Sequence, residues 1–213
     1  MSRIQNLAAI WQIKLQKKNF RNSLIVTLVL LASILFLLAK FLTHNELRRG
    51  FSFNDPLLKL FAPVDVTWLT FGLIYLALII AFFSLTFHPE KMLLALQSYT
   101  LIASMRIITI YFLPLNAPPL TIPLKDPFVE LFGNGETFLH DLFFSGHTST
   151  MFLLFLTTQN KRLKSIFLIC TILVASCVLI QHVHYTIDVI AAPFFAYTCY
   201  RISYLINSHI KNS

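Results

Sequence analysis

Long apolar segments separated by short polar links dominate the chain. A helix needs roughly 17–25 mostly apolar residues to cross about 30 Å of hydrocarbon at about 1.5 Å per residue. Six segments have this character, although the fourth is short for a full crossing: residues 22–42, 66–87, 92–113, 144–158, 163–181 and 184–206. Backbone groups in lipid must be satisfied within their own segment, so the pattern predicts an all-α polytopic protein with six transmembrane helices.

The composition supports this interpretation. Hydrophobic residues make up 56% of the 213 residues and charged residues only 12%, against about 25% charged residues in an average soluble domain. So little charge cannot cover a water-soluble globule, and so high an apolar share excludes a disordered chain. The chain therefore divides into an N-terminal segment (1–21), a six-helix membrane domain (22–207) and a short tail (208–213).

The distribution of charge predicts the orientation. Most of the Lys and Arg residues lie in the N-terminal segment, in the link before residue 163 and near the C-terminus, whereas most acids lie in the other links. Because positive links stay on the cytosolic side, both termini are predicted to be cytosolic. The net charge of +8 then reflects topology. Nucleic-acid binding is not favoured, since no folded basic patch with interleaved stacking residues is evident.

Ionisable groups within or beside a membrane span are costly, which makes each a candidate for function. The first candidates are Ser145, Gly146 and His147, at the start of the fourth segment. Glycine permits close backbone approach, and a hydroxyl beside helix N-terminal amides suits a phosphate. His147 can carry a proton to or from an oxygen. The alternative is that these residues form only a polar helix cap.

A second group lies at the start of the sixth segment. His184 and Asp188 are four residues apart and share one helical face, so the carboxylate can hold the imidazole in one tautomer. The alternative is a structural His–Asp pair between helices. His182 and His184 point to different faces of a helix, which does not favour a metal site, and no cofactor or metal is needed.

The predicted orientation in the membrane does not account for two further charged residues. Arg106 is inside the third segment and needs an anionic partner, either a protein carboxylate or a substrate phosphate. Asp141 precedes His147 by six residues and can orient a histidine or attract a cationic headgroup. Glu136, in the same loop, is more simply a solvated acid.

The predicted topology brings these candidates together. The starts of the fourth and sixth segments and the end of the third share the non-cytosolic face, which is periplasmic if the protein is bacterial. His147, His184 and Asp188 then lie at one membrane level. Two histidines and an aspartate in this arrangement suit phosphoryl transfer through a phospho-histidine, in which one histidine attacks phosphorus and the other protonates the leaving oxygen.

These motifs resemble those of the sphingomyelin synthase family, a branch of the type-2 phosphatidic acid phosphatase superfamily. Ser145-Gly146-His147-Thr148 and His182-x-His184-Tyr185-Thr186-x-Asp188 are the most specific matches, Asp141 fits an Asp-x-x-x-Ser-Gly-His pattern, and the Arg106 segment is a weaker match. The resemblance implies a transferase of sphingolipid metabolism. Such an enzyme moves a phosphocholine or phosphoethanolamine headgroup from phosphatidylcholine or phosphatidylethanolamine to ceramide or a diacylglycerol-type alcohol.

The resemblance also implies roles for individual residues. His184 would be the nucleophile, Asp188 its orienting partner and His147 the acid and base, with Asp141 supporting this cluster. The chain departs from the wider superfamily, which carries Ser-Arg where this chain has Cys177 and Val178. Without this Arg, the chain has fewer cations to hold a phosphate, which favours a singly charged phosphodiester over a doubly charged phosphomonoester. The alternatives are a lipid phosphate phosphatase and a phospholipase C-like hydrolase.

Overall fold

A computed structural model of the chain describes residues 3–126 and 138–212. Over these residues the protein is all-helical, with seven α-helices and no strand, which confirms the predicted class. The helices are α1 (Arg3–Gln16), α2 (Lys18–Asn45), α3 (Thr67–Thr86), α4 (Pro89–Phe112), α6 (Gly146–Thr157), α7 (Lys161–Ile180) and α8 (Thr186–Asn212), with a 3-10 turn η1 at Leu58–Leu60.

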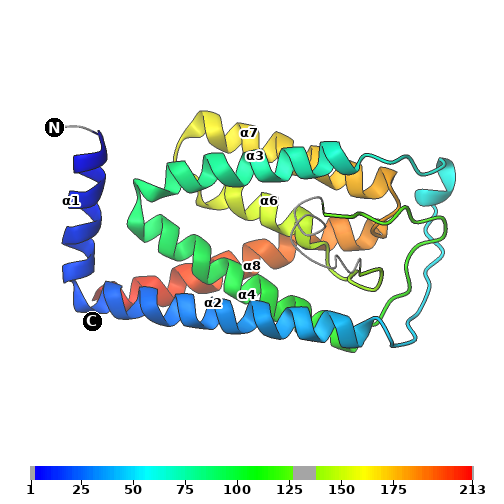
Figure 1. Ribbon diagram of the computed structural model, residues 1–213, viewed down its shortest axis with the longest axis horizontal. Helices are drawn as coiled ribbons and strands as arrows, with labels where there is room; N and C mark the ends of the chain where they lie inside the picture. Colours follow the sequence, from blue (N-terminus) through cyan, green and yellow to red (C-terminus); the bar gives the residue numbers. More distant parts are fainter. Residues whose placement is uncertain (1–2, 127–137, 213) are drawn as a thin grey trace.

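Helices α2, α3, α4, α6, α7 and α8 run back and forth as a bundle, and both chain termini lie at the same end of it (Figure 1). Helix α1 lies across this end of the bundle (Figure 1). The sequence pattern did not predict α1, because α1 is too polar and too short to resemble a span. Its Trp11 Nε1 donates to the Thr86 carbonyl at 2.8 Å, which joins α1 to the end of α3.

Five of the described helices are long and apolar enough to cross a membrane: α2, α3, α4, α7 and the 186–208 part of α8. The fourth predicted span corresponds to α6, which has only 12 residues and is therefore about 18 Å long. No residue of α6 is exposed, because α3, α4, α7 and α8 surround it. A short helix is stable in this position because neighbouring helices, rather than lipid, cover its sides.

The helix boundaries follow from local chemistry. Pro89 occupies the first turn of α4, where its missing N–H leaves no hydrogen bond unmade. The Asn160 Oδ1 accepts the N–H groups of Arg162 and Leu163 and so caps α7. The link between α6 and α7 is short, which makes the two helices antiparallel neighbours.

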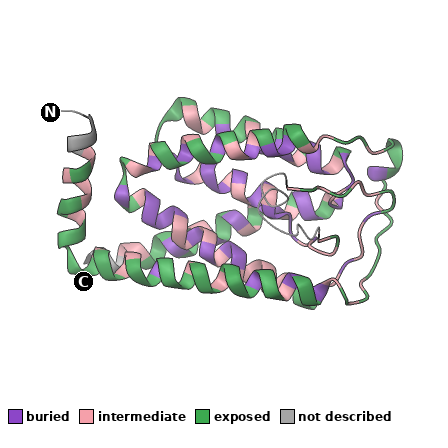
Figure 2. Cartoon of the chain, viewed as in Figure 1, coloured by how far each residue is buried: buried purple, intermediate pink, exposed green. Residues whose placement is uncertain are grey.

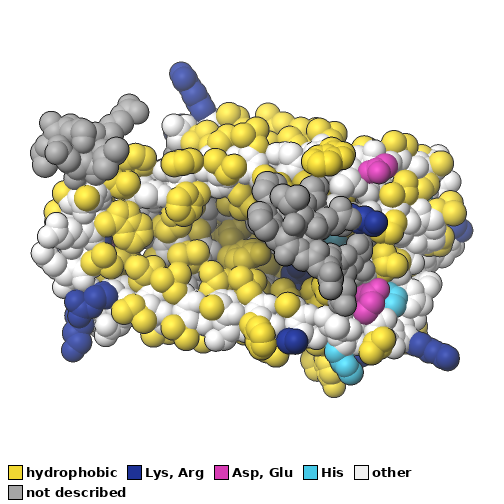
Figure 3. All heavy atoms as spheres, in the orientation of Figure 1, with side chains coloured by type: hydrophobic (Ala, Val, Ile, Leu, Met, Phe, Trp, Pro, Cys, Tyr) yellow, Lys and Arg dark blue, Asp and Glu magenta, His cyan; other side chains and the backbone are white. Residues whose placement is uncertain are grey.

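The buried residues concentrate around α6 (Figure 2). One cluster joins α3, α6 and α7 through residues such as Phe71, Met151 and Phe167. Another joins α4, α6 and α8, where the Phe144 ring stacks on Phe195 with centroids 4.2 Å apart. On the face in Figure 3, hydrophobic side chains cover the length of the bundle, while Asp, Glu and His side chains gather toward the end away from the termini.

Candidate active site

The turn between α7 and α8 presents His184 and Asp188. Asp188 Oδ2 accepts the Tyr185 N–H at 3.0 Å, an N-terminal capping contact that fixes the first turn of α8. The same oxygen lies 3.4 Å from His184 Nδ1, a long contact of the kind that tightens when substrate binds. Both side chains are buried. A carboxylate at Nδ1 sets the tautomer of the imidazole and leaves Nε2 for chemistry.

The start of α6 presents His147 beside this pair. Ser145 caps α6, with its Oγ accepting the Thr148 N–H, and its own N–H donates to the Asp188 carbonyl at 3.2 Å. This bond ties the start of α6 to the first turn of α8. The rings of His147 and His184 consequently lie with centroids 6.4 Å apart and planes at 65°.

Arg106 reaches the same place from α4. Its guanidinium forms an ion pair with Asp141 through Nη2 and Oδ1, while its Nε is buried with no hydrogen-bond partner among the described residues. The guanidinium lies directly over Gly146, where any Cβ would overlap Nη1 and Cζ. Gly146 is therefore required for close approach of Arg106, which places a cation next to His147.

A carboxylate from the loop before η1 also supports α8. Asp55 Oδ2 accepts the Thr186 N–H at 2.7 Å, and its Oδ1 accepts the Thr186 hydroxyl at 3.0 Å. Burial raises the pKa of Asp55, but the hydrogen bonds from Thr186 and Leu57 outweigh it and hold the pKa below its ordinary value. Sequence reasoning missed Asp55, since nothing in the pattern indicates a partner 131 residues away.

The C-terminal end of α2 holds the segment that leads to Asp141. The Glu46 carboxylate accepts the N–H groups of Leu139 and His140, each at 3.1 Å, and Asn45 Nδ2 donates to the His140 carbonyl at 3.0 Å. Asn45 is buried. These contacts fix the backbone next to Asp141 and, through the ion pair, the position of Arg106.

Of the predicted site residues, the structure brings together His147, His184, Asp188, Ser145, Gly146, Arg106 and Asp141. The His182 and Tyr185 side chains contact loops instead. The His182 ring packs against Phe61 with centroids 5.3 Å apart, and the Tyr185 hydroxyl donates to the Asn116 carbonyl at 3.1 Å. Glu136 lies outside the described residues. Within 3–126 and 138–212, no group of three or more His, Cys, Asp or Glu residues is arranged to hold a metal ion.

The Asp55 contact predicts a pH-dependent stability of the start of α8. A carboxylate whose pKa is lowered by folding stabilises the protein above its unfolded pKa, about 3.9, and loses this effect as the pH falls through the folded pKa. We therefore expect Asp55→Asn to lower the melting temperature near pH 7 by a few degrees, comparable to losing a helix cap worth about 1 kcal/mol. The difference from the unaltered protein should shrink below about pH 4.

Hydrogen exchange localises this effect. The amides of residues 185–188 should exchange faster in Asp55→Asn than in the unaltered protein at neutral pH. Asp65→Asn is the matched control, because Asp65 Oδ1 accepts the N–H of its near neighbour Thr67, at the start of α3 rather than of α8. If both variants left the exchange of residues 185–188 unchanged, Asp55 would not support α8.

Comparison with known proteins adds one finding. Residues 140–206 match the family model for the C-terminal part of the PAP2 superfamily, the type-2 phosphatidic acid phosphatases. The matched segment contains His147, His184 and Asp188, so this part of the chain is similar to a superfamily of phosphoryl-transfer enzymes. The match does not single out the sphingomyelin synthase branch. No curated protein and no solved structure gives a match to the chain.

Five of the described helices can cross a membrane, which together with this similarity indicates a multi-pass membrane protein.

Proposed function

We propose that the protein transfers a phosphorylated headgroup, phosphocholine or phosphoethanolamine, from a glycerophospholipid to a lipid alcohol of the ceramide or diacylglycerol type. The observation that carries the proposal is the position of His184, which is buried, held at Nδ1 by Asp188 and placed beside His147. In this proposal, the turn before α8 and the first turn of α8 supply the nucleophile and the group that orients it, and the start of α6 supplies His147 as the proton carrier.

The first half-reaction forms a phospho-histidine. His184 Nε2 attacks the phosphorus of the donor lipid, the P–O bond to diacylglycerol breaks, and His147 gives its proton to the departing oxygen. Asp188 stabilises the positive charge that develops on the His184 ring.

The second half-reaction reverses these roles. The hydroxyl of the acceptor lipid attacks phosphorus and gives its proton to His147, and the P–N bond to His184 breaks. His147 is then protonated and His184 is free, as at the start, so no co-reactant is required.

The charge around the histidines supports a diester substrate. Arg106 is the cation placed beside Gly146, and its ion pair with Asp141 already balances part of its charge. A phosphodiester carries one negative charge and a phosphomonoester carries up to two, so a cation whose charge is already partly balanced suits the diester better. Asp141 additionally offers a carboxylate to a cationic headgroup.

A lipid-extract assay tests the proposal. The purified full chain in vesicles receives headgroup-labelled phosphatidylcholine or phosphatidylethanolamine, with fluorescent ceramide and fluorescent diacylglycerol as competing acceptors. We expect a new labelled phospholipid, whose mass identifies headgroup and acceptor. Release of inorganic phosphate from phosphatidic acid without diester cleavage would establish the phosphatase alternative. A water-soluble headgroup phosphate as the sole product would establish the hydrolase alternative.

The contact between Gly146 and Arg106 gives a specific prediction for this reaction. In Gly146→Ala the added methyl group overlaps the guanidinium, so the flexible Arg106 side chain must move away from His147. We expect turnover to fall by about 10²-fold, since removing one charge-stabilising group costs this much, while the melting temperature changes by only a few degrees.

Gly72→Ala is the matched control, because a Cβ at this helical position meets no atom within 4 Å. Its turnover should equal that of the unaltered protein. If Gly146→Ala were as active as Gly72→Ala, the position of Arg106 would not matter for the reaction.

A further inference from the structure

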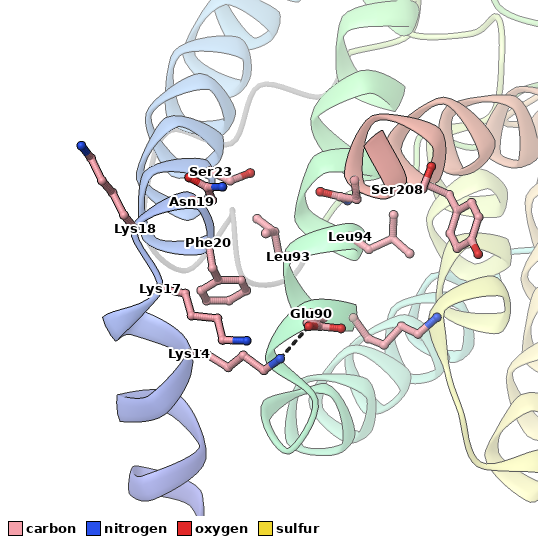
Figure 4. A pocket seen from close by; sticks show the side chains of 13 residues that line it. Lys14, Lys17, Lys18, Asn19, Phe20, Ser23, Glu90, Leu93, Leu94 and Ser208 are labelled. Atoms are coloured by element: carbon pink, nitrogen blue, oxygen red, sulfur yellow. Dashed lines mark hydrogen bonds and ion pairs between the residues drawn. The ribbon is translucent and has the colours of Figure 1, made fainter. Parts of the chain in front are cut away.

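A cavity of about 690 Å³ lies at the end of the bundle that carries the chain termini, away from His147 and His184. The junction of α1 with α2 forms one wall, the end of α8 forms the other, and the start of α4 lies between them (Figure 4). From Glu90 to Arg106, α4 extends about 24 Å. This cavity, which we call the α4 trough, is therefore a separate site from the candidate active site.

The lining of the α4 trough is strongly basic. Three lysines and one glutamate contribute charge to it: Lys14, Lys17, Lys91 and Glu90. Lys18 also borders the trough, but its ammonium group does not face it (Figure 4). Lys14 Nζ lies 2.6 Å from Glu90 Oε1, and this ion pair joins α1 to α4. Lys17 extends its ammonium group toward the same place as Lys14, whereas Lys18 points away from the other labelled side chains (Figure 4).

The start of α2 adds hydrogen-bond donors to these cations. Its N-cap residue, Lys17, makes no side-chain capping hydrogen bond within the described part of the chain. Residues of the first turn of α2, including Asn19 and Phe20, line the trough. The N–H groups of a helix's first turn carry partial positive charge and bind anions. Lysine ammonium groups beside such a helix start are a chemical setting that favours phosphate.

The inner end of the trough is polar and its floor is apolar. Asn207 donates to Gln97 at 2.6 Å, and Gln97 donates to Ser23 at 3.1 Å, so a chain of amides and a hydroxyl links α8, α4 and α2. Leu93 and Leu94 form part of the floor. In α2, shortly after the residues that line the trough, apolar side chains such as Ile25 and Val26 are exposed and offer acyl chains a surface.

We propose that the α4 trough binds the phosphate of an anionic membrane lipid, with the acyl chains lying along α2. The charge distribution of the sequence predicts that this end of the bundle faces the cytosol, where the leaflet carries anionic lipids. A lipid in the trough contacts α1, α2, α4 and α8 together and so stabilises the docking of α1 on the bundle.

Binding of short-chain lipids to the full-length protein in neutral detergent tests the proposal. Dioctanoyl phosphatidic acid, dioctanoyl phosphatidylcholine and glycerol 3-phosphate are titrated separately, with native mass spectrometry as the readout. We expect phosphatidic acid to bind most tightly and to raise the melting temperature. The double variant Lys17→Gln/Lys91→Gln should bind phosphatidic acid at least about tenfold more weakly, because each lysine near a lipid surface strengthens anion binding severalfold.

Lys18→Gln is the matched control, since it removes the same charge from the neighbouring position but its ammonium points away from the trough. It should bind phosphatidic acid within about twofold of the unaltered protein. The comparison is repeated in a His184→Ala background, where the loss caused by the two lysine substitutions should be the same if the lipid is not bound at the histidines. If the double variant does not fold, Lys17→Gln alone should weaken binding about threefold.

Three results would overturn the proposal. Equal weakening by Lys18→Gln and by the double variant would show a general effect of surface charge. Unchanged binding in the double variant would place the lipid elsewhere. Glycerol 3-phosphate binding as tightly as phosphatidic acid would show that the trough takes a soluble phosphate ester rather than a lipid.

Discussion

His184→Ala is expected to lower headgroup transfer by about 10³-fold or more, the loss typical of removing a covalent nucleophile. Without the His184 imidazole, the proposed phospho-histidine cannot form. His147 does not replace it as the nucleophile, because Asp188 contacts His184. The measurement is the rate of labelled-lipid formation by purified protein in vesicles. A rapid-quench experiment with headgroup-labelled donor should also show acid-labile, base-stable label on the unaltered protein and none on the variant.

His182→Ala is the matched control for this experiment. It removes an imidazole two positions away whose ring packs on Phe61 rather than on His147. We expect its rate per folded molecule to stay within about threefold of the unaltered protein. Transfer that persists in His184→Ala, or labelling that is lost instead in His182→Ala, would contradict the assignment of the nucleophile.

Asp188→Asn is expected to lower kcat by about 10²–10⁴-fold with little change in KM. The amide oxygen of asparagine can still accept the Tyr185 N–H, so the start of α8 keeps its cap. The amide cannot, however, stabilise a positively charged His184 ring as a carboxylate does. The substitution therefore separates the electrostatic role of Asp188 from its structural role, and the melting temperature should change by only a few degrees.

The pH profile of transfer adds a second readout for Asp188. If the carboxylate stabilises the charged imidazole that forms during the reaction, the pH profile of transfer should differ between Asp188→Asn and the unaltered protein. Asp188→Ala is the control that removes the cap as well. Full activity in Asp188→Asn together with unfolding of Asp188→Ala would mean that Asp188 is a structural cap only.

Most of the fold could be predicted from hydrophobic patterning. The six apolar segments locate α2, α3, α4, α6, α7 and α8, because an uninterrupted apolar run in a chain with few charges has one stable conformation in lipid. Helix α1 could not be found in this way, since the feature that positions it is a contact of Trp11 with the end of α3. The pattern also could not tell that α6 is enclosed by protein, because apolar residues look the same whether they face lipid or other helices.

The candidate site was predictable where it depends on local spacing. His184 and Asp188 are only four residues apart, so their contact could be predicted from the sequence. The predicted shared helical face is wrong, because α8 begins at Thr186 and His184 lies in the turn before it. The partner of Arg106 was left open between a carboxylate and a substrate, and the structure shows Asp141 in that position. The role of Asp55 depends on a loop returning to a helix start far along the chain, and no local pattern carries such information.

Because of these long-range contacts, the geometry of the predicted motifs depends on residues outside the motifs. The segment 140–206 that matches the family model contains His147 and His184, but three residues whose contacts hold the neighbouring backbone and side chains, Asp55, Arg106 and Glu46, belong to the first half of the chain. If the segment 140–206 were transferred into another helical protein, it would carry the two histidines but not the residues of the first half of the chain that hold the segment in place. We therefore expect substitutions in the first half of the chain to disturb the positions of His147 and His184 without changing any residue of the segment 140–206.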